Sequence, residues 1–166
     1  HRDFVWEVPQ RYNIGVDVCG RWAGDRSRFA LYTEDDRGVT SAWTFWDIQQ
    51  AANRLSNVLA ALGTQRGDRV AIMMPQRAQT GIAHVAIYQM GAVAVPLSHL
   101  FGPDALEYRL QDAGVHLAIV DEVTLPKLLE IRDQLPALRH IIGVDIDPVT
   151  AAAAGVRQWS AVLEHA

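Results

Sequence analysis

From residue 69 onward, short apolar runs alternate with segments of helical character, and this alternation constrains the fold more than any other feature. The apolar runs are "RVAIMMP" (69–75), "VAVPL" (93–97), "HLAIVDE" (116–122) and "HIIGVDI" (140–146). Buried strands separated by helices predict βαβ units and a parallel sheet that is covered on both faces. Because βαβ crossovers are right-handed, we expect the carboxyl ends of these strands along one edge of the sheet.

The residues before this region predict a helix and a β-hairpin. The segment 13–23 carries apolar residues at helical spacing, namely Ile14, Val18 and Trp22. The runs "RFALYTED" (28–35) and "VTSAWTF" (39–45) flank a polar turn at 35–38, which is typical of a hairpin. The predicted fold class is therefore α/β, a mostly parallel sheet with helices on both faces, preceded by an N-terminal helix and a β-hairpin.

One strongly amphipathic helix joins the hairpin to the first predicted strand of the sheet. Thr44 and Asp47 have the spacing of a capping box, and apolar residues then repeat every three or four positions up to Gly63. At the other end, residues 148–157 are rich in Ala and Gly, so we expect a linker there, followed by a terminal surface helix at 158–164. The chain begins at His1 without Met, and we interpret residues 1–166 as one domain, a piece of a larger protein.

Composition excludes several classes of protein. A net charge of −4 and a pI near 5.8 argue against a nucleic-acid partner, which requires a basic face. The sequence contains no apolar stretch long enough for a membrane span. Cys19 is the single cysteine, which permits no internal disulfide and predicts a cytoplasmic location. We expect a small-molecule substrate. A homo-oligomer is also an open alternative, because an unpaired strand at the edge of a sheet can pair with a second copy of the chain.

The elbow "SHLFG", residues 98–102, follows one predicted strand and precedes a helix that starts at Pro103. Ligands of parallel α/β sheets bind outside the carboxyl ends of the strands, where helix N-termini offer unpaired N–H groups. Ligand contacts are therefore predicted at Ser98, His99, Leu100 and Gly102. Neighbouring contributions to this crevice are expected from Pro75, Gln76, Arg77, Asp121 and Glu122.

For several other chemically suggestive residues we favour a structural interpretation. His84 lies in an apolar helical segment and is expected to be a core or interface histidine, and Cys19 a buried, inert thiol. The acidic pairs Asp121–Glu122 and Asp145/Asp147 are expected to be solvated strand ends, because a hard cation needs three or more converging oxygens. "RGD" (66–68) is expected to form a turn, Arg77 to be a surface arginine, and the five tryptophans to be packing anchors. No catalytic residue or metal ligand is assigned to this chain.

Residues 44–122 contain, in order, an aromatic-rich helix start, "GDRVAI" (67–72), "MGAVAVPL" (90–97), "DALEYRLQDAG" (104–114) and "LAIVDE" (117–122). In this order and spacing the motifs resemble the N-terminal part of the AMP-forming acyl-CoA synthetases, members of the adenylate-forming enzyme superfamily. It implies a ligase in which a carboxylate attacks the α-phosphate of ATP, and the thiol of coenzyme A then displaces AMP from the acyl-adenylate. Mg²⁺ would accompany ATP, and the acyl substrate would be a short- or medium-chain fatty acid or a similar acid.

The resemblance also implies what this chain lacks. The family's phosphate loop ending in Pro-Lys-Gly, its later acidic motif and its C-terminal catalytic lysine have no counterpart in the sequence, so the chain alone is expected to be inactive and to bind none of these cofactors tightly. In related acetyl-CoA synthetases the backbone of the elbow approaches coenzyme A, a role that would fall on Ser98, His99 and Leu100. Arginines near the coenzyme's phosphate are absent here, and Lys127 would be a shifted substitute. A non-catalytic α/β module and a ligase that serves a carrier protein remain alternatives.

Overall fold

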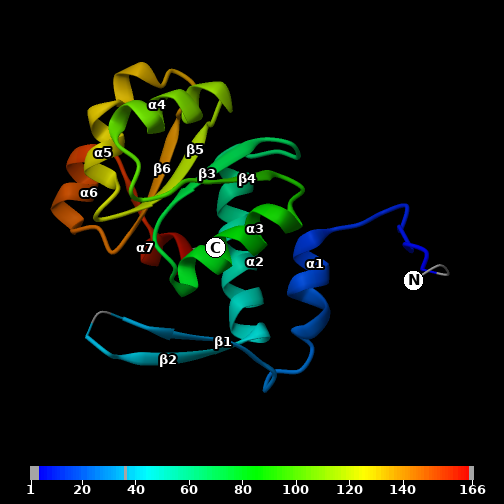
Figure 1. Ribbon diagram of the computed structural model, residues 1–166. Helices are drawn as coiled ribbons and strands as arrows, with labels where there is room; N and C mark the ends of the chain where they lie inside the picture. Colours follow the sequence, from blue (N-terminus) through cyan, green and yellow to red (C-terminus); the bar gives the residue numbers. More distant parts are fainter. Residues whose placement is uncertain (1–3, 36, 165–166) are drawn as a thin grey trace.

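A parallel five-stranded sheet forms the centre of the molecule, whose computed structural model describes residues 4–35 and 37–164 (Figure 1). The strand order is β4-β3-β5-β6-β7, and every pairing between neighbours is parallel. The strands are β3 (Arg69–Met73), β4 (Val93–Pro96), β5 (Leu117–Asp121), β6 (His140–Val144) and β7 (Arg157–Gln158). The predicted parallel sheet is confirmed, with β7 as an additional, very short edge strand.

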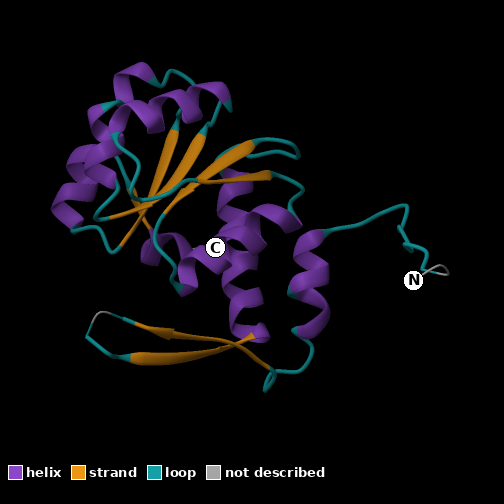
Figure 2. Cartoon of the chain, in the orientation of Figure 1, coloured by secondary structure: helices purple, strands orange, loops and turns teal. Residues whose placement is uncertain are grey.

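Helices cover both faces of this sheet (Figure 2). One face packs against α2 (Phe45–Ala61), α3 (Ala78–Gln89) and α7 (Trp159–Glu164), and the other against α4 (Pro103–Asp112), α5 (Leu125–Glu130) and α6 (Pro148–Ala154). Alternation along β3 shows how one strand serves two cores, since Val70 and Ile72 join the first core whereas Ala71 and Met73 join the second. The α/β prediction with helices on both faces is therefore confirmed.

The helix α2 begins with the capping box that the sequence predicts. The Thr44 hydroxyl accepts a hydrogen bond from the Asp47 amide, and the Asp47 carboxylate accepts one from the Thr44 amide at 2.9 Å. The helix ends before Gly63, whose φ of 88° lies in the left-handed region that glycine tolerates. None of the helices in 4–35 and 37–164 is both long and apolar enough to cross a membrane.

The N-terminal helix predicted over 13–23 is broken into α1 (Ile14–Val18) and a 3₁₀ turn (Gly20–Trp22). The expected apolar stripe is wrong in detail, because Ile14 and Val18 are exposed while Gly15 and Cys19 are buried. Gly15 permits close packing on α3, since a Cβ at this position would lie 2.8 Å from the Gln89 amide nitrogen. A small residue therefore sets the helix contact, which an apolar pattern does not reveal.

The predicted hairpin is present as the antiparallel pair β1 (Phe29–Glu34) and β2 (Thr40–Thr44). The hairpin lies at the N-terminal end of α2 and forms a two-stranded sheet that is separate from the main sheet (Figure 1). Asp36, expected in its turn, lies outside the described residues.

The Ala/Gly-rich linker predicted at 148–157 is wrong, because this stretch forms α6, a left-handed turn at Gly155 and the start of β7. The Asp147 carboxylate accepts a hydrogen bond from the Thr150 amide at 2.9 Å, and Pro148 occupies the first helical position. Both residues favour a helix start, and alanine favours the helix interior. The terminal helix is likewise not confined to the surface, since Trp159 and Val162 are buried in the core that includes α2.

Candidate functional site at the carboxyl edge of the sheet

The carboxyl ends of β3, β4, β5 and β6 lie along one edge, and the segments that follow them form a rim. Two cavities of about 330 Å³ and 610 Å³ open at this rim, and Pro75, Gln76 and His99 line both. Ser98 lines the smaller cavity, and Arg77, Asp121 and Glu122 line the larger one. The structure therefore brings together most of the residues that the sequence placed around a crevice.

The elbow between β4 and α4 is a compact turn. The Phe101 amide donates to the Ser98 carbonyl oxygen at 3.1 Å, and the Leu100 amide donates to the Ser98 hydroxyl at 3.2 Å. Leu100 is 78% exposed at the tip, and Gly102 precedes the first turn of α4. Neither Leu100 nor Gly102 is among the residues that line the two cavities, so Ser98 and His99 are the elbow residues that face them.

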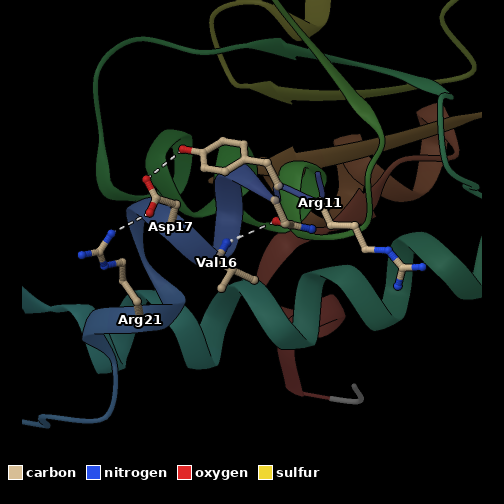
Figure 3. A pocket seen from close by; sticks show the side chains of 6 residues that line it. Arg11, Val16, Asp17 and Arg21 are labelled. Atoms are coloured by element: carbon tan, nitrogen blue, oxygen red, sulfur yellow. Dashed lines mark hydrogen bonds and ion pairs between the residues drawn. The ribbon is translucent and has the colours of Figure 1, made fainter. Parts of the chain in front are cut away.

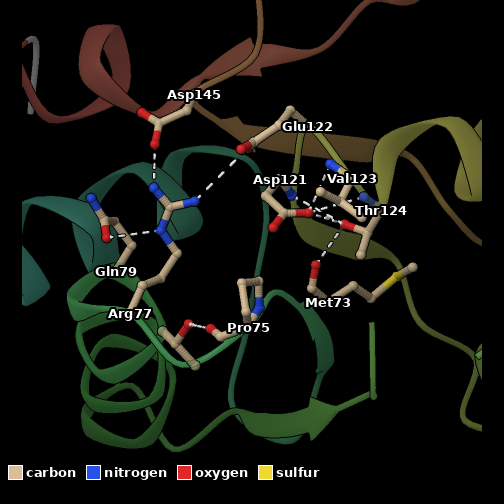
Figure 4. A network of polar contacts seen from close by, with 10 residues as sticks. Met73, Pro75, Arg77, Gln79, Asp121, Glu122, Val123, Thr124 and Asp145 are labelled. Atoms are coloured by element: carbon tan, nitrogen blue, oxygen red, sulfur yellow. Dashed lines mark hydrogen bonds and ion pairs between the residues drawn. The ribbon is translucent and has the colours of Figure 1, made fainter. Parts of the chain in front are cut away.

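Arg77 ties three strand ends together instead of lying free on the surface (Figure 4). Its guanidinium forms an ion pair with Asp145 after β6 and a second one, at 3.9 Å, with Glu122 after β5. The Nε atom also donates to the side-chain oxygen of Gln79 at 3.2 Å. Because two carboxylates offset its charge, Arg77 serves to hold the rim and is poorly suited to recruit a phosphate.

Asp121 contradicts the expectation that the acidic pairs are solvated strand ends, because it is 1% exposed. Its carboxylate accepts hydrogen bonds from the amides of Val123 and Thr124, at 3.2 Å and 2.9 Å. The Thr124 hydroxyl lies 2.6 Å from the Met73 carbonyl oxygen and 2.8 Å from the same carboxylate (Figure 4). The turn after β5 is thus locked to the end of β3, and Asp121 has a structural role.

Two further predictions concern groups with potential chemistry. Cys19 is 2% exposed, and burial raises the pKa of its thiol to about 11, which confirms an inert thiol. The His84 Nδ1 atom lies 2.8 Å from the Thr80 carbonyl oxygen, which satisfies one ring nitrogen as expected. The ring also lines the smaller cavity together with His99, a position that the apolar pattern around it did not reveal.

The hairpin contributes a wall to the larger cavity, and sequence reasoning missed this contribution. Thr33, Glu34 and Trp43 line it together with the residues of the rim. No local sequence pattern predicts that the hairpin lines this cavity, because the contact depends on how the hairpin packs against distant elements. "RGD" at 66–68 is a turn, as predicted, with Gly67 at a φ of 85°.

The charges around the larger cavity are predominantly acidic. Four carboxylate residues line it, Glu34, Asp35, Asp121 and Glu122, against the single guanidinium of Arg77. Such a surface repels phosphate groups. Across residues 4–35 and 37–164 no group of three or more His, Cys, Asp or Glu side chains is arranged to hold a metal ion.

A third cavity, of about 440 Å³, lies beside α1, and its lining residues all come from the segment 11–21 (Figure 3). The Tyr12 hydroxyl donates to Asp17 at 2.8 Å, and Arg21 pairs with the same carboxylate at 2.6 Å. The hydrogen bond from Tyr12 is the main cause that lowers the pKa of the Asp17 carboxyl, and the one from Arg21 is the next. Asp17 and Arg21 thus offset each other's charge within this cluster, and Arg11 lines the same cavity.

Residues 21–163 match the family model described as AMP-binding enzyme, and the chain belongs to this family. The resemblance to the AMP-forming acyl-CoA synthetases is thereby confirmed. The chain is 37% identical over 116 residues to an acetyl-coenzyme A synthetase of Streptomyces coelicolor, which covers 69% of this chain and 18% of that protein. It is 29% identical over 148 residues to a 3-hydroxypropionyl-coenzyme A synthetase of Sulfurisphaera tokodaii, covering 87% of this chain and 22% of the relative.

Solved structures of ligases have the same fold. An anthranilate CoA ligase in complex with anthranoyl-AMP superposes with a TM-score of 0.81 at 27% identity, over 96% of this chain and 28% of that one. An acyl-CoA synthetase of Brucella canis gives a TM-score of 0.83 at 25% identity, over 93% and 28% respectively. The chain thus spans about a fifth of the length of the two curated relatives and 28% of the two solved chains.

Proposed function

We propose that this chain forms the N-terminal part of an AMP-forming acid–thiol ligase. In the proposed reaction a carboxylate attacks the α-phosphate of ATP, giving an acyl-adenylate and pyrophosphate, and the thiol of coenzyme A then displaces AMP. The match of residues 21–163 to the AMP-binding enzymes carries this proposal. Relatives named as acetyl- and 3-hydroxypropionyl-coenzyme A synthetases support a small carboxylic acid as the substrate.

Within that enzyme, the chain would supply scaffold and one wall of the coenzyme A crevice. Its backbone at the elbow, Ser98, His99, Leu100 and Gly102, would approach the thiol substrate, because this turn stands at the carboxyl edge of the sheet next to both cavities. The acidic larger cavity argues against phosphate binding inside it, so the coenzyme's phosphates would lie outside that cavity.

The remaining chemistry would come from residues outside this chain. Mg²⁺ would accompany ATP, and no group of three or more His, Cys, Asp or Glu side chains among the described residues is arranged to hold it. The single, buried cysteine supports a reducing compartment such as the cytoplasm. We further propose that residues 1–166 act as one structural unit and bind Mg-ATP only weakly without the rest of the enzyme; isothermal calorimetry that gives a micromolar dissociation constant for this chain alone would contradict that.

The proposed function is tested with the protein encoded by the complete reading frame around these residues. Pyrophosphate release is measured with ATP, Mg²⁺ and a panel of carboxylic acids from acetate upward, with and without coenzyme A. The proposal expects acid-dependent pyrophosphate formation and accumulation of an acyl-CoA. Release of pyrophosphate that requires a carrier protein in place of coenzyme A would move the assignment to a carrier-dependent ligase, and no acid-dependent release would overturn it.

A further inference from the structure

Lys127 is the only lysine of the chain, and its side chain reaches from α5 to the elbow. Its ammonium donates to the His99 carbonyl oxygen at 2.6 Å and lies 3.4 Å from the Phe101 carbonyl oxygen. Leu125 and Leu128, on either side of it, are buried in the second core and fix the helix that carries it. A cation on a well-anchored element is therefore held against two carbonyl groups of the elbow.

The other hydrogen bonds of the elbow are local. Ser98 accepts from the amides of Leu100 and Phe101, and Gly102 accepts from the first turn of α4. Among the described residues, Lys127 is the only residue outside the elbow and α4 that hydrogen-bonds to residues 98–102. Lys127 thus supplies the hydrogen bonds that tie this turn to another element, beside the apolar packing of Phe101 against the second core.

The two carbonyl contacts also determine the orientation of the elbow's peptide groups. In a trans peptide the C=O and the following N–H point in opposite directions, and no cis peptide occurs in the described chain. With the Phe101 carbonyl directed at Lys127, the Gly102 N–H is directed away from it. That N–H has no protein partner in the part of the chain that the structure describes, so it stays available at the start of α4.

We infer that Lys127 is a positioning residue for the thiol substrate, which it serves by fixing the backbone of the elbow. The inference rests on the proposed function for the identity of that substrate, coenzyme A. Two of the three ammonium donors are directed at carbonyl oxygens, which makes Lys127 a brace of the elbow and not a substitute for the phosphate-binding arginines of relatives. Its loss weakens the step that uses the thiol and leaves acyl-adenylate formation intact.

The test uses the protein of the complete reading frame and two separate assays. Acid-dependent exchange of pyrophosphate into ATP, without coenzyme A, reports the first step, and the KM for coenzyme A in acyl-CoA formation reports the second. For Lys127→Met we expect exchange within about twofold of wild type and a KM for coenzyme A raised about tenfold, the size of effect that one lost charge-assisted hydrogen bond produces. Lys127→Arg, which keeps a cation with several donors, should recover part of the loss.

Arg139→Met is the matched control, because it also replaces a long cationic side chain by methionine, but at an exposed position just before β6, at the opposite end of the strands. It should leave both assays unchanged. An unaltered KM for coenzyme A in Lys127→Met, or an equal loss in both assays, overturns the inference. If Lys127→Met does not fold, Lys127→Gln decides by the same two readouts. Absence of exchange in the wild-type protein overturns the proposed function instead, so the two failures are distinguishable.

Discussion

The turn after β5 gives the sharpest prediction about stability, because one buried hydroxyl joins two strands. Thr124 is 0% exposed, and its hydroxyl accepts a hydrogen bond from the Asp121 amide at 3.1 Å while it lies 2.6 Å from the Met73 carbonyl oxygen. Thr124→Val preserves the shape of the side chain but removes both contacts, together with the 2.8 Å contact between the hydroxyl and the Asp121 carboxylate, which keeps its two amide donors. The Asp121 amide and the Met73 carbonyl then lose this partner without access to water.

The expected magnitude follows from these two groups. A buried donor or acceptor left without a partner costs about 1–3 kcal/mol, so we expect Thr124→Val to lower the free energy of unfolding by about 2–4 kcal/mol. With a urea m-value of about 2 kcal/mol/M, the midpoint should fall by about 1–2 M. Thr124→Ser is the control, because it keeps the hydroxyl and loses one methyl group, at about 1 kcal/mol.

The assay is urea denaturation followed by tryptophan fluorescence and circular dichroism, with m-values compared between variants. The argument requires that Thr124→Val be clearly less stable than Thr124→Ser. Equal midpoints for wild type and Thr124→Val, or a larger loss in the serine variant, would show that the hydroxyl does not hold β5 to β3.

Three further outcomes are expected. Gly143→Ala should lower stability by about 1–3 kcal/mol in the same titration through overpacking, since a Cβ there would lie 2.4 Å from Ile146 Cγ1; an unchanged midpoint would contradict the packing around β6. Hydrogen bonds from the Thr44 hydroxyl and then its amide lower the pKa of Asp47. A carboxyl whose pKa is lowered in the folded state stabilises above its unfolded pKa, so Asp47→Ala should cost about 1 kcal/mol at neutral pH and less as pH falls below about 4; a loss independent of pH would refute this. Because burial raises the pKa of Cys19 to about 11, a thiol reagent at about pH 8 should modify it far more slowly in the native than in the urea-unfolded protein, and equal rates would contradict its burial.

Strands β3, β5 and β6 were predictable from sequence because each buries an apolar run, whereas β4, at the edge of the sheet, is only partly buried. Strand β5, for example, is buried along its whole length, as its apolar run 117–120 predicts for a strand covered on both faces. The start of α6 was also encoded, by Asp147 and Pro148, but its Ala-rich interior was interpreted as a linker. Composition misled there because alanine is both small and a strong helix former.

The site was predictable only in outline. The strand ends could be placed on one edge because topology requires it, whereas the side-chain pairings could not. Lys127 reaches the elbow across 28 positions of sequence, and Arg77 reaches Asp145 across 68. Such contacts depend on the packing of distant elements, which no local pattern encodes. For the same reason the hairpin's contribution to the larger cavity became visible only in the structure.

The central claim, that this chain is part of an enzyme in which a carboxylate attacks the α-phosphate of ATP, has a direct measurement. The complete protein is supplied with ATP, Mg²⁺, coenzyme A and a carboxylic acid labelled with heavy oxygen on its carboxylate, and the products are weighed by mass spectrometry. Attack at the α-phosphate transfers one labelled oxygen to AMP for each acyl-CoA formed. Label that appears in inorganic phosphate, with ADP as the nucleotide product, would contradict the account.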